Sequence, residues 1–299
     1  FVVEGEALDA DGIRRQVMKI ANSTVVVGDD RVIRVHAHAE DPGPLLSLGA
    51  SIGRLDQVSI QNMDLQHQQF MARHGYTRAE KPPFAIVAVV PRTGLKQVFL
   101  DLGAATVVEG GQTMNPSTSD ILDAAGRANG LCTLVLPNNK NIILAAEQAA
   151  GLVDGSITVV PSTTIPEGIA ALLASNPDLS NDENIAAMNH ALSTVQSGEV
   201  TVAVRSTNSD GIEIAQGQAI AILDGRVTAT AENPNSALLK MLVFADPEED
   251  SLVTLYYGAD LDRATAEAAS VEIQTRFTGV EVELIEGGQP HYHYIVSVE

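Results

Sequence analysis

The chain has little positive charge, little cysteine and no long apolar run. It carries 18 Lys and Arg against 38 Asp and Glu, a formal net charge of −20. Such a balance argues against nucleic acid or an anionic membrane surface as the main partner. Its single cysteine, Cys132, excludes an intramolecular disulfide framework. No apolar stretch approaches the roughly 18 residues of a membrane-spanning helix. We therefore expect a cytoplasmic protein without membrane insertion, whose partners are neutral, cationic or metal-bearing.

The length of 299 residues gives an expectation of about two domains. The chain opens on Phe rather than Met, and residues 1–6 are typical of a strand rather than a signal peptide. We therefore expect that a preceding segment has been removed.

The first 71 residues have the pattern of a small ferredoxin-like α+β domain. Their apolar periodicity predicts the order β-α-β-β-α-β, with strands at 1–6, 23–27, 31–38 and 58–60. A polar helix is expected at 62–70. Residues 72–83 combine basic residues, a glycine and a Pro-Pro pair, which is the composition of a linker.

Residues 84–299 are predicted to form a bilobal α/β domain with a mainly parallel sheet. Continuous apolar strands at 84–90, 106–109, 132–136 and 157–160 alternate with helical patterns, which is typical of a sheet covered on both faces. From about residue 211 the pattern becomes rich in strands. Ligands in parallel sheets bind beyond the carboxyl ends of the strands, so the segments after these strands are the place to look for function.

Those segments are unusually polar. Loop 110–118 offers glycines, hydroxyls and amides, and Lys140, one of five lysines in the chain, could neutralise a carboxylate or phosphate. The alternative is that these side chains cap the helices that follow. The candidate ligand- or partner-binding residues are Gln112, Thr113, Asn115, Ser117, Asn138, Asn139, Lys140, Asn141 and Thr163.

The sharpest local motif is His36-Ala37-His38 on a predicted strand. Residues two apart share one face of a strand, so the two imidazoles could converge on one metal ion of the zinc type. The alternative is a pair of surface histidines. Spacing does not fix a third ligand, although Glu40, Asp41, His67 and His74 are available. An open-sided site could also activate water, which leaves a metal-dependent phosphatase or hydrolase as an alternative function.

The chain lacks the glycine-rich phosphate loop, the dinucleotide-binding glycine motif and the nucleophile elbow. A second pair, His291 and His293, lies beside tyrosines, so packing is as good an explanation as ligation. Cys132 falls on an apolar strand, where an inert core thiol is expected.

Several longer motifs occur in one colinear order along almost the whole chain. They are Val27–Asp30, Val35–His38 with Asp41–Gly43, Asn62-Met63 with Gln66-His67, Glu109–Thr118, Leu136–Asn141, Gly198–Thr201, Gly287–Tyr292 and Ser297–Glu299. Together they resemble the bacterial fatty acid kinase A-subunit family, also described as dihydroxyacetone-kinase-like proteins.

The resemblance implies the middle and C-terminal parts of a three-part protein. ATP and Mg²⁺ would then bind only to an N-terminal kinase module, and this chain alone would be non-catalytic. Zinc would be held by His36, His38 and a cysteine upstream of Phe1. The C-terminal domain would be related to DegV-like fatty-acid-binding proteins, with Gly287–Tyr292 in place of their His-containing glycine-rich ending. Gln289 of this segment is a further candidate ligand- or partner-binding residue.

The implied partners are a DegV-like fatty-acid-binding protein, which presents the acyl carboxylate for phosphorylation, and a second copy of the chain. The implied role is metal binding and partner docking. The alternative within the family is a small-molecule module that binds fatty acyl groups itself.

Overall fold

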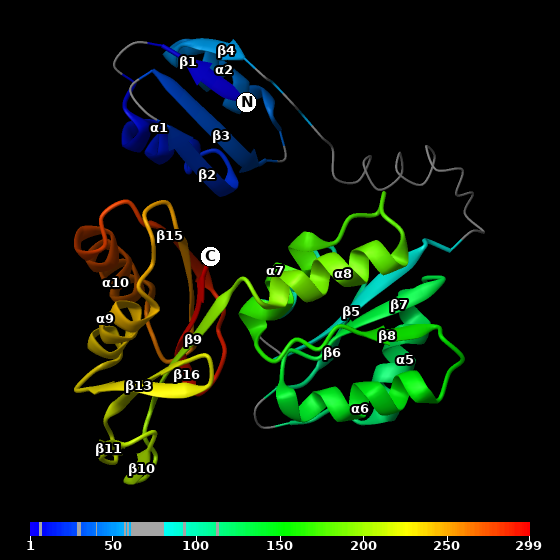
Figure 1. Cartoon of the computed structure of the whole chain (residues 1–299). Coiled ribbons are helices and arrows are strands. Elements are labelled where there is room, and N and C mark those ends of the chain that lie inside the picture. The colour runs from blue at the N-terminus through cyan, green and yellow to red at the C-terminus, as the bar shows by residue number, and fades with distance from the viewer. Residues whose placement is uncertain are drawn as a thin grey trace. The chain divides into compact units, whose positions relative to one another are not determined.

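The computed structural model describes residues 1–5, 8–28, 31–39, 41–56, 58, 60, 81–91, 94–111 and 114–299. The chain divides into two compact units, Phe1–Ala79 and Glu80–Glu299 (Figure 1). The predicted helix at 62–70 and most of the predicted linker at 72–83 lie outside the described residues. In the described part of the chain, no helix has both the length and the apolar character needed to cross a membrane.

The first unit has the predicted β-α-β-β-α-β order. Its sheet runs β2-β3-β1-β4 with every neighbouring pair antiparallel, consistent with a ferredoxin-like arrangement. The elements are β1 (Val2–Glu4), α1 (Ala10–Val17), β2 (Asn22–Gly28), β3 (Val32–His38), α2 (Gly43–Ile52) and β4 (Arg54–Asp56).

Alternation along β3 sets the core of this unit. Ile33 and Val35 are buried against the apolar faces of α1 and α2, whereas Arg34 is exposed, as the strand pattern predicts. The prediction of a fourth strand at 58–60 is wrong, because α2 ends at Ile52 and, after its cap Gly53, residues Arg54–Asp56 pair with β1. Val58 and Ile60 are exposed.

The first lobe of the second unit is built on a parallel sheet in the order β6-β5-β7-β8, which confirms the predicted parallel sheet. Helices α5 and α6 pack on one face, and α4, α7 and α8 pack on the other. The elements are β5 (Phe84–Val90), α4 (Gly94–Asp101), β6 (Thr106–Glu109), α5 (Thr118–Ala128), β7 (Cys132–Leu136), α6 (Lys140–Gly151), β8 (Ile157–Val159), α7 (Ile165–Ala174) and α8 (Asn181–Leu192).

The second lobe contains a six-stranded sheet in the order β13-β12-β9-β16-β14-β15. It is antiparallel except for the β14·β15 pair, so parallel pairing is confined to the first lobe and this one edge. The strands are β9 (Gln196–Val202), β12 (Ala219–Leu223), β13 (Arg226–Ala231), β14 (Leu252–Tyr257), β15 (Glu281–Glu286) and β16 (Tyr292–Val298), and β10 (Thr207–Ser209) with β11 (Ile212–Ile214) forms a separate hairpin.

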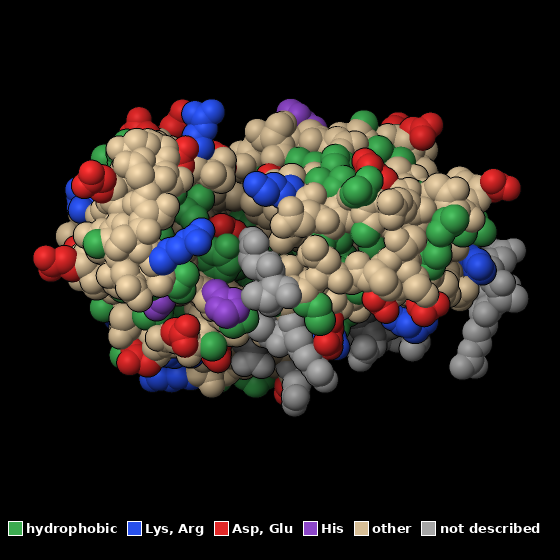
Figure 2. Space-filling model, turned by 90° about the horizontal axis from the view of Figure 1, so that it is seen from below, with side chains coloured by type: hydrophobic (Ala, Val, Ile, Leu, Met, Phe, Trp, Pro, Cys, Tyr) green, Lys and Arg blue, Asp and Glu red, His purple; other side chains and the backbone are tan. Residues whose placement is uncertain are grey.

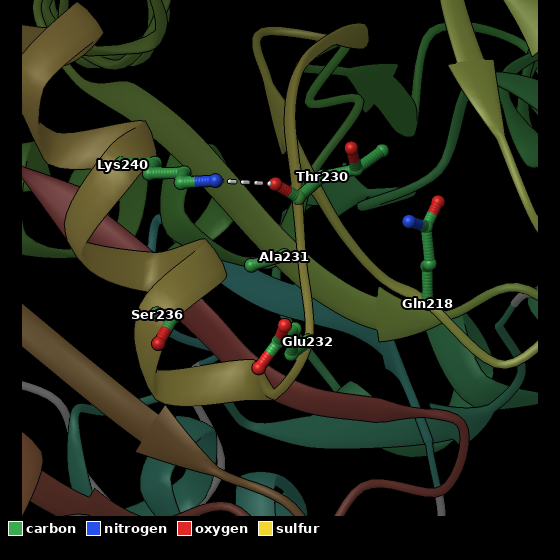
Figure 3. Close-up of a pocket in the computed structure, with 6 residues that line it drawn as sticks. All are labelled: Gln218, Thr230, Ala231, Glu232, Ser236 and Lys240. Atoms are coloured by element: carbon green, nitrogen blue, oxygen red, sulfur yellow. Dashed lines mark hydrogen bonds between the residues drawn. The ribbon is translucent and has the colours of Figure 1, made fainter.

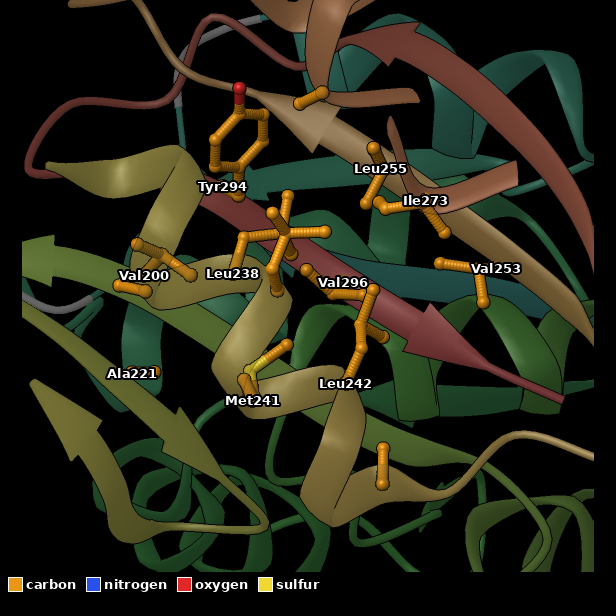
Figure 4. Close-up of a cluster of buried hydrophobic side chains, with 14 of the residues drawn as sticks. Val200, Ala221, Leu238, Met241, Leu242, Val253, Leu255, Ile273, Tyr294 and Val296 are labelled. Atoms are coloured by element: carbon orange, nitrogen blue, oxygen red, sulfur yellow. The ribbon is translucent and has the colours of Figure 1, made fainter. Parts of the chain in front are cut away.

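Two helices, α9 (Pro234–Ala245) and α10 (Arg263–Arg276), cover one face of this sheet (Figure 1). Figure 4 shows their contact with the strands, where Leu238 and Leu242 of α9 lie against Val200 and Val296. Tyr256 and Ile295 point to the opposite face, where they join the core of the first lobe. The sheet is therefore shared between two cores, and the lobes meet along it.

Candidate functional site

A pocket of about 470 Å³ lies where the two lobes of the second unit meet. Its first wall is formed by the carboxyl ends of β5, β6 and β7 and the start of α7, the location expected for a ligand on a parallel sheet. Its second wall is formed by β9, β16 and residues 288–291. Figure 2 shows this part of the surface from below, hollowed between the lobes. The described lining residues are Val89, Pro91, Gly110, Gly111, Met114, Pro137, Asn138, Asn139, Thr164, Ile165, Glu199, Gly288, Gln289, Pro290, His291, Tyr292 and Ile295.

Polar residues at the first wall cap helices. The Asn139 side chain accepts a hydrogen bond from the Asn141 backbone N–H at the start of α6 (2.9 Å). Thr164 Oγ1 accepts from the Glu167 N–H at the start of α7 (3.2 Å) and lies 2.7 Å from Ser197 Oγ of β9. Both side chains cap a helix, because their oxygens accept hydrogen bonds from the free N–H groups at the helix start.

Asn138 joins the strand ends beneath the pocket. Its Nδ2 donates to the Val89 carbonyl (3.0 Å), its Oδ1 accepts from Ser162 Oγ (2.7 Å), and its backbone N–H donates to that same hydroxyl (3.0 Å). Asn138 has a φ of 54°, a backbone conformation that asparagine tolerates better than most residues. On α7, Gly168 leaves the room that Asn138 Oδ1 occupies. Asn138 therefore holds the ends of β5, β7 and β8 together.

The second wall holds a half-buried carboxylate, Glu199. It lies on β9 between apolar neighbours, paired with Ile222 of β12 and Ile295 of β16. Burial raises the pKa of Glu199, and the hydrogen bond from the Tyr292 hydroxyl and the charge of Lys140 oppose that rise. Burial, together with Glu199, raises the pKa of Tyr292. The Tyr292 hydroxyl therefore stays protonated and donates to Glu199.

Gln289 fixes the loop that closes the second wall. Its side chain is 1% exposed, and its Nε2 donates to the Tyr256 carbonyl at the end of β14 (2.7 Å). Its Oε1 occupies the space left by the missing side chain of Gly287 and has no hydrogen-bond partner among the described residues. Gln289 is therefore held by the backbone around it, and one acceptor atom remains unused.

The remaining loop residues predicted as ligands lie outside the pocket lining. Ser117 forms a reciprocal cap with Asp120 at the start of α5, and Thr163 donates its hydroxyl to Glu167. The other three, Asn115, Lys140 and Asn141, are exposed. The predicted residues Gln112 and Thr113 lie outside the described residues, so the predicted set stays a prediction, with Asn138, Asn139 and Gln289 brought to one cavity.

The predicted metal ligands His36 and His38 occupy alternate positions of β3, and their side chains lie outside the described part of the structure. Asp41, named as an available ligand, accepts a hydrogen bond from the Gly43 N–H at the start of α2. Among the described residues no group of three His, Cys, Asp or Glu side chains could hold a metal ion. Zinc at this strand stays a prediction.

At the second histidine pair, β16 carries a bulge at His293. Tyr292 pairs with Thr201 and Tyr294 with Val200, so one residue is inserted between the two tyrosines. His291 adopts a φ of 71° and lines the pocket, whereas His293 Nδ1 is buried without a partner among the described residues. The bulge breaks the alternation that would make the pair share one face.

A second hollow, of about 440 Å³, lies between β13 and the start of α9 (Figure 3). Its Lys240 Nζ donates to the Thr230 carbonyl (2.8 Å), and Glu232 and Ser236 line the same space. The ammonium group is thus already engaged by the backbone. None of its described lining residues belongs to the strand ends of the parallel sheet, where ligands of such sheets bind.

Sequence reasoning missed Glu199 as a site residue and left Tyr292 and Thr164 out of the predicted set. In the structure Glu199 stands beside the fully buried Val200 in the middle of a central strand, which the sequence does not reveal. A charged residue is rare at such a position unless it is paired. The partner Tyr292 is 93 residues away in sequence, so spacing could not indicate it.

The fold resembles that of DegV family proteins. A DegV family protein from Corynebacterium glutamicum superposes with a TM-score of 0.56 at 16% identity, over 72% of this chain and 97% of that one. A dihydroxyacetone kinase of C. freundii gives 0.51 at 13% identity, over 82% of this chain and 56% of the kinase. At such identities the likeness concerns the fold alone.

Sequence comparison gives the family. A model of the C-terminal domain of FakA-like proteins, the fatty acid kinase A-subunit-like family, matches residues 85–299, and a model of the middle domain of the same family matches residues 1–70. Protein YloV of Bacillus subtilis (strain 168) is 40% identical over 296 residues, which are 97% of this chain and 54% of YloV. An uncharacterized protein of Staphylococcus aureus (strain USA300) is 33% identical, over 98% of this chain and 54% of its own length. The chain belongs to the FakA-like fatty acid kinase family and spans about half the length of these relatives.

Proposed function

We propose that this chain is the metal-binding and partner-docking portion of a fatty-acid-kinase-like protein, and that it transfers no phosphoryl group by itself. ATP and Mg²⁺ would act through a separate kinase module. Family membership over both units supports the kinase relationship. The partner we propose is a DegV-like protein that carries the fatty acid.

The observation that favours docking over carriage of the acyl group is the position of Glu199. One structural neighbour, a DegV family protein from Thermus thermophilus, binds fatty acid. It superposes on this chain with a TM-score of 0.50 at 15% identity. In this chain the pocket between the lobes has a carboxylate in its wall. A fatty acid carboxylate beside Glu199 would place two like charges in a half-buried site, which is unfavourable. The same fold would therefore serve to receive a partner.

The proposal is tested by mixing the purified chain with the DegV-like protein of the same organism, loaded with oleate. We expect a complex in sedimentation velocity and no acyl phosphate after addition of MgATP, with acyl phosphate trapped as its hydroxamate. Hydroxamate formed without a separate kinase module would contradict the proposal. So would oleate retained by the chain alone, which would favour the fatty-acyl-binding alternative. We also propose that the chain forms the homodimer implied by the family resemblance, and sedimentation velocity of the chain alone tests it.

For the metal we propose zinc at His36 and His38. Imidazole nitrogen is a common zinc ligand. Side chains at alternate strand positions lie on one face of the strand, where they can share one ion. In the register of β1 against β3, Val2 pairs with Arg34, so a strand residue preceding Phe1 would fall opposite His36. That is where the cysteine implied by the family resemblance would complete the set.

Zinc content measured by inductively coupled plasma mass spectrometry tests this site. In a protein that includes the upstream cysteine, we expect His36→Ala and His38→Ala each to abolish stoichiometric zinc. His190→Ala, at an exposed position of α8, is the matched control and should leave zinc unchanged. Full zinc in both strand variants would refute the assignment.

A further inference from the structure

The charge of the pocket between the lobes is unbalanced. Glu199 is the single carboxylate among its described lining residues, and no described Lys or Arg lines it. Lys140, at the first turn of α6, influences Glu199 electrostatically but forms no ion pair within 4.0 Å of it in the described structure. The whole chain is strongly acidic, so its field attracts cations to such a cavity.

Glu199 has unused hydrogen-bonding capacity. A carboxylate offers about four acceptor positions. The β9 backbone is fixed on both sides by β12 and β16, and the side chain takes one side-chain hydrogen bond, from Tyr292. The ring of Tyr292 lines the same cavity, and an aromatic face also attracts a cation.

The rest of the lining is mostly apolar. Val89, Met114 and Ile165 come from the first lobe, and Pro290 and Ile295 come from the second. An alkyl stem could lie along these side chains while its charged end reaches Glu199. Lysine and arginine side chains combine such a stem and end, as do simple alkylamines.

We infer that this pocket binds an alkylammonium or alkylguanidinium group, with the cation against Glu199 and the alkyl stem against the apolar lining. The inference rests on the proposed function, in which the pocket receives a partner rather than an acyl carboxylate. The cation has two possible sources, a free amine and a protein side chain, with one shared chemistry.

Calorimetric titration of the full chain with n-hexylammonium, hexanol and hexanoate tests the inference. We expect hexylammonium to bind most tightly, hexanol more weakly, and hexanoate without saturation. Glu199→Gln should weaken hexylammonium binding by about tenfold or more, because a hydrogen bond to a charged group is lost. The same variant should change the affinity for hexanol by no more than about twofold, since the apolar lining is unchanged.

Two further variants control for general charge effects. Glu147→Gln removes a carboxylate at an exposed position of α6 and should leave hexylammonium binding unchanged. Lys140→Gln removes a positive charge near Glu199 and should strengthen it. Hexanoate that binds as tightly as hexylammonium, or an amine affinity that Glu199→Gln leaves unchanged in a folded protein, would overturn the inference.

Titration with N-acetyl-lysinamide and N-acetyl-argininamide separates the two sources. Binding of either amide at least as tight as that of hexylammonium assigns the pocket to a protein side chain, and weaker binding assigns it to a free amine. Saturable amine binding without docking of the DegV-like protein would overturn the proposed function and keep the ligand class. Docking of the DegV-like protein without amine binding would overturn the inferred ligand class and keep the proposed function.

Discussion

The two walls of the pocket use their polar residues differently. On the first wall, Asn139 and Thr164 cap helices and Asn138 joins strand ends. On the second wall, Glu199 has one side-chain hydrogen bond, from Tyr292, and Gln289 keeps an acceptor unused. Polar groups that already satisfy the backbone have little capacity left for a ligand. A polar loop after a strand is therefore a weaker indication of binding than a carboxylate held in an apolar sheet.

The largest expected effect separates two adjacent asparagines of the first wall. Asn138→Ala removes the donor to the Val89 carbonyl and the acceptor for Ser162, at a residue with positive φ. We expect it to lower the free energy of unfolding by about 2–4 kcal/mol. Asn139→Ala removes one helix cap and should cost about 1 kcal/mol. Urea unfolding measures both, and equal losses would contradict the distinction.

A second prediction concerns the space beneath Asn138. Gly168→Ala places a Cβ where Asn138 Oδ1 lies, so we expect a loss of about 1–3 kcal/mol. Gly126→Ala, in α5, meets nothing within 4 Å and should instead stabilise by about 0.5–1 kcal/mol, since alanine favours helix. Both variants are compared by thermal unfolding. A gain in stability from Gly168→Ala would show that Asn138 is not confined as described.

A third prediction tests whether Ser117 caps a helix or binds a ligand. Ser117→Ala should lower stability by about 1 kcal/mol, because the Asp120 N–H loses its acceptor, whereas Ser117→Gly should cost a few tenths. Circular dichroism during chemical unfolding gives both values. Amine or partner binding should be unchanged in either variant, and a loss of binding in both would restore Ser117 to the site.

The smallest expected effect is on the second wall and depends on pH. Because burial raises the pKa of Glu199, the folded state holds its proton more tightly than the unfolded state does. Stability from this group is therefore present below the unfolded pKa and is lost as pH rises through the folded pKa. Glu199→Gln removes the cost of the buried charge, so we expect a melting temperature higher by about 1–2 °C at pH 7.5.

At pH 4 the same comparison should give almost no difference, because Glu199 is mostly protonated in both states there. Scanning calorimetry at the two pH values measures it. A variant that is less stable at pH 7.5 would mean that the bond from Tyr292 outweighs the cost of burial.

Much of the architecture could be predicted from local pattern. The strands at 84–90 and 132–136 are continuous apolar runs, which buried parallel strands require, and the structure has them at those bounds. The fourth strand of the first unit was misplaced to 58–60, because those residues are apolar but β1 pairs with Arg54–Asp56 instead. Helix α9 was not predicted, since its residues are apolar nearly all round and lack the periodicity of a half-exposed helix.

The site was predicted in part for the same reason. The loops at the carboxyl ends of the strands could be located, because parallel strands bring those ends to one edge of the sheet. Whether Asn138 faces a ligand or binds the Val89 carbonyl depends on contacts 49 residues apart, which no local pattern contains.

Sequence alone was enough for the acidity of the chain, its family and the strand alternation that buries Ile33 and Val35. Each of these follows from residues that are close in the chain or from overall composition. The sequence left open whether Ser117 and Asn139 cap helices or bind a ligand, and the structure shows both as caps. The meeting of Glu199 with Tyr292, in a cavity facing Asn138, came only with the folded arrangement. The physical reason is that burial and charge depend on which distant strands pair, and pairing is set by the packing of the whole sheet.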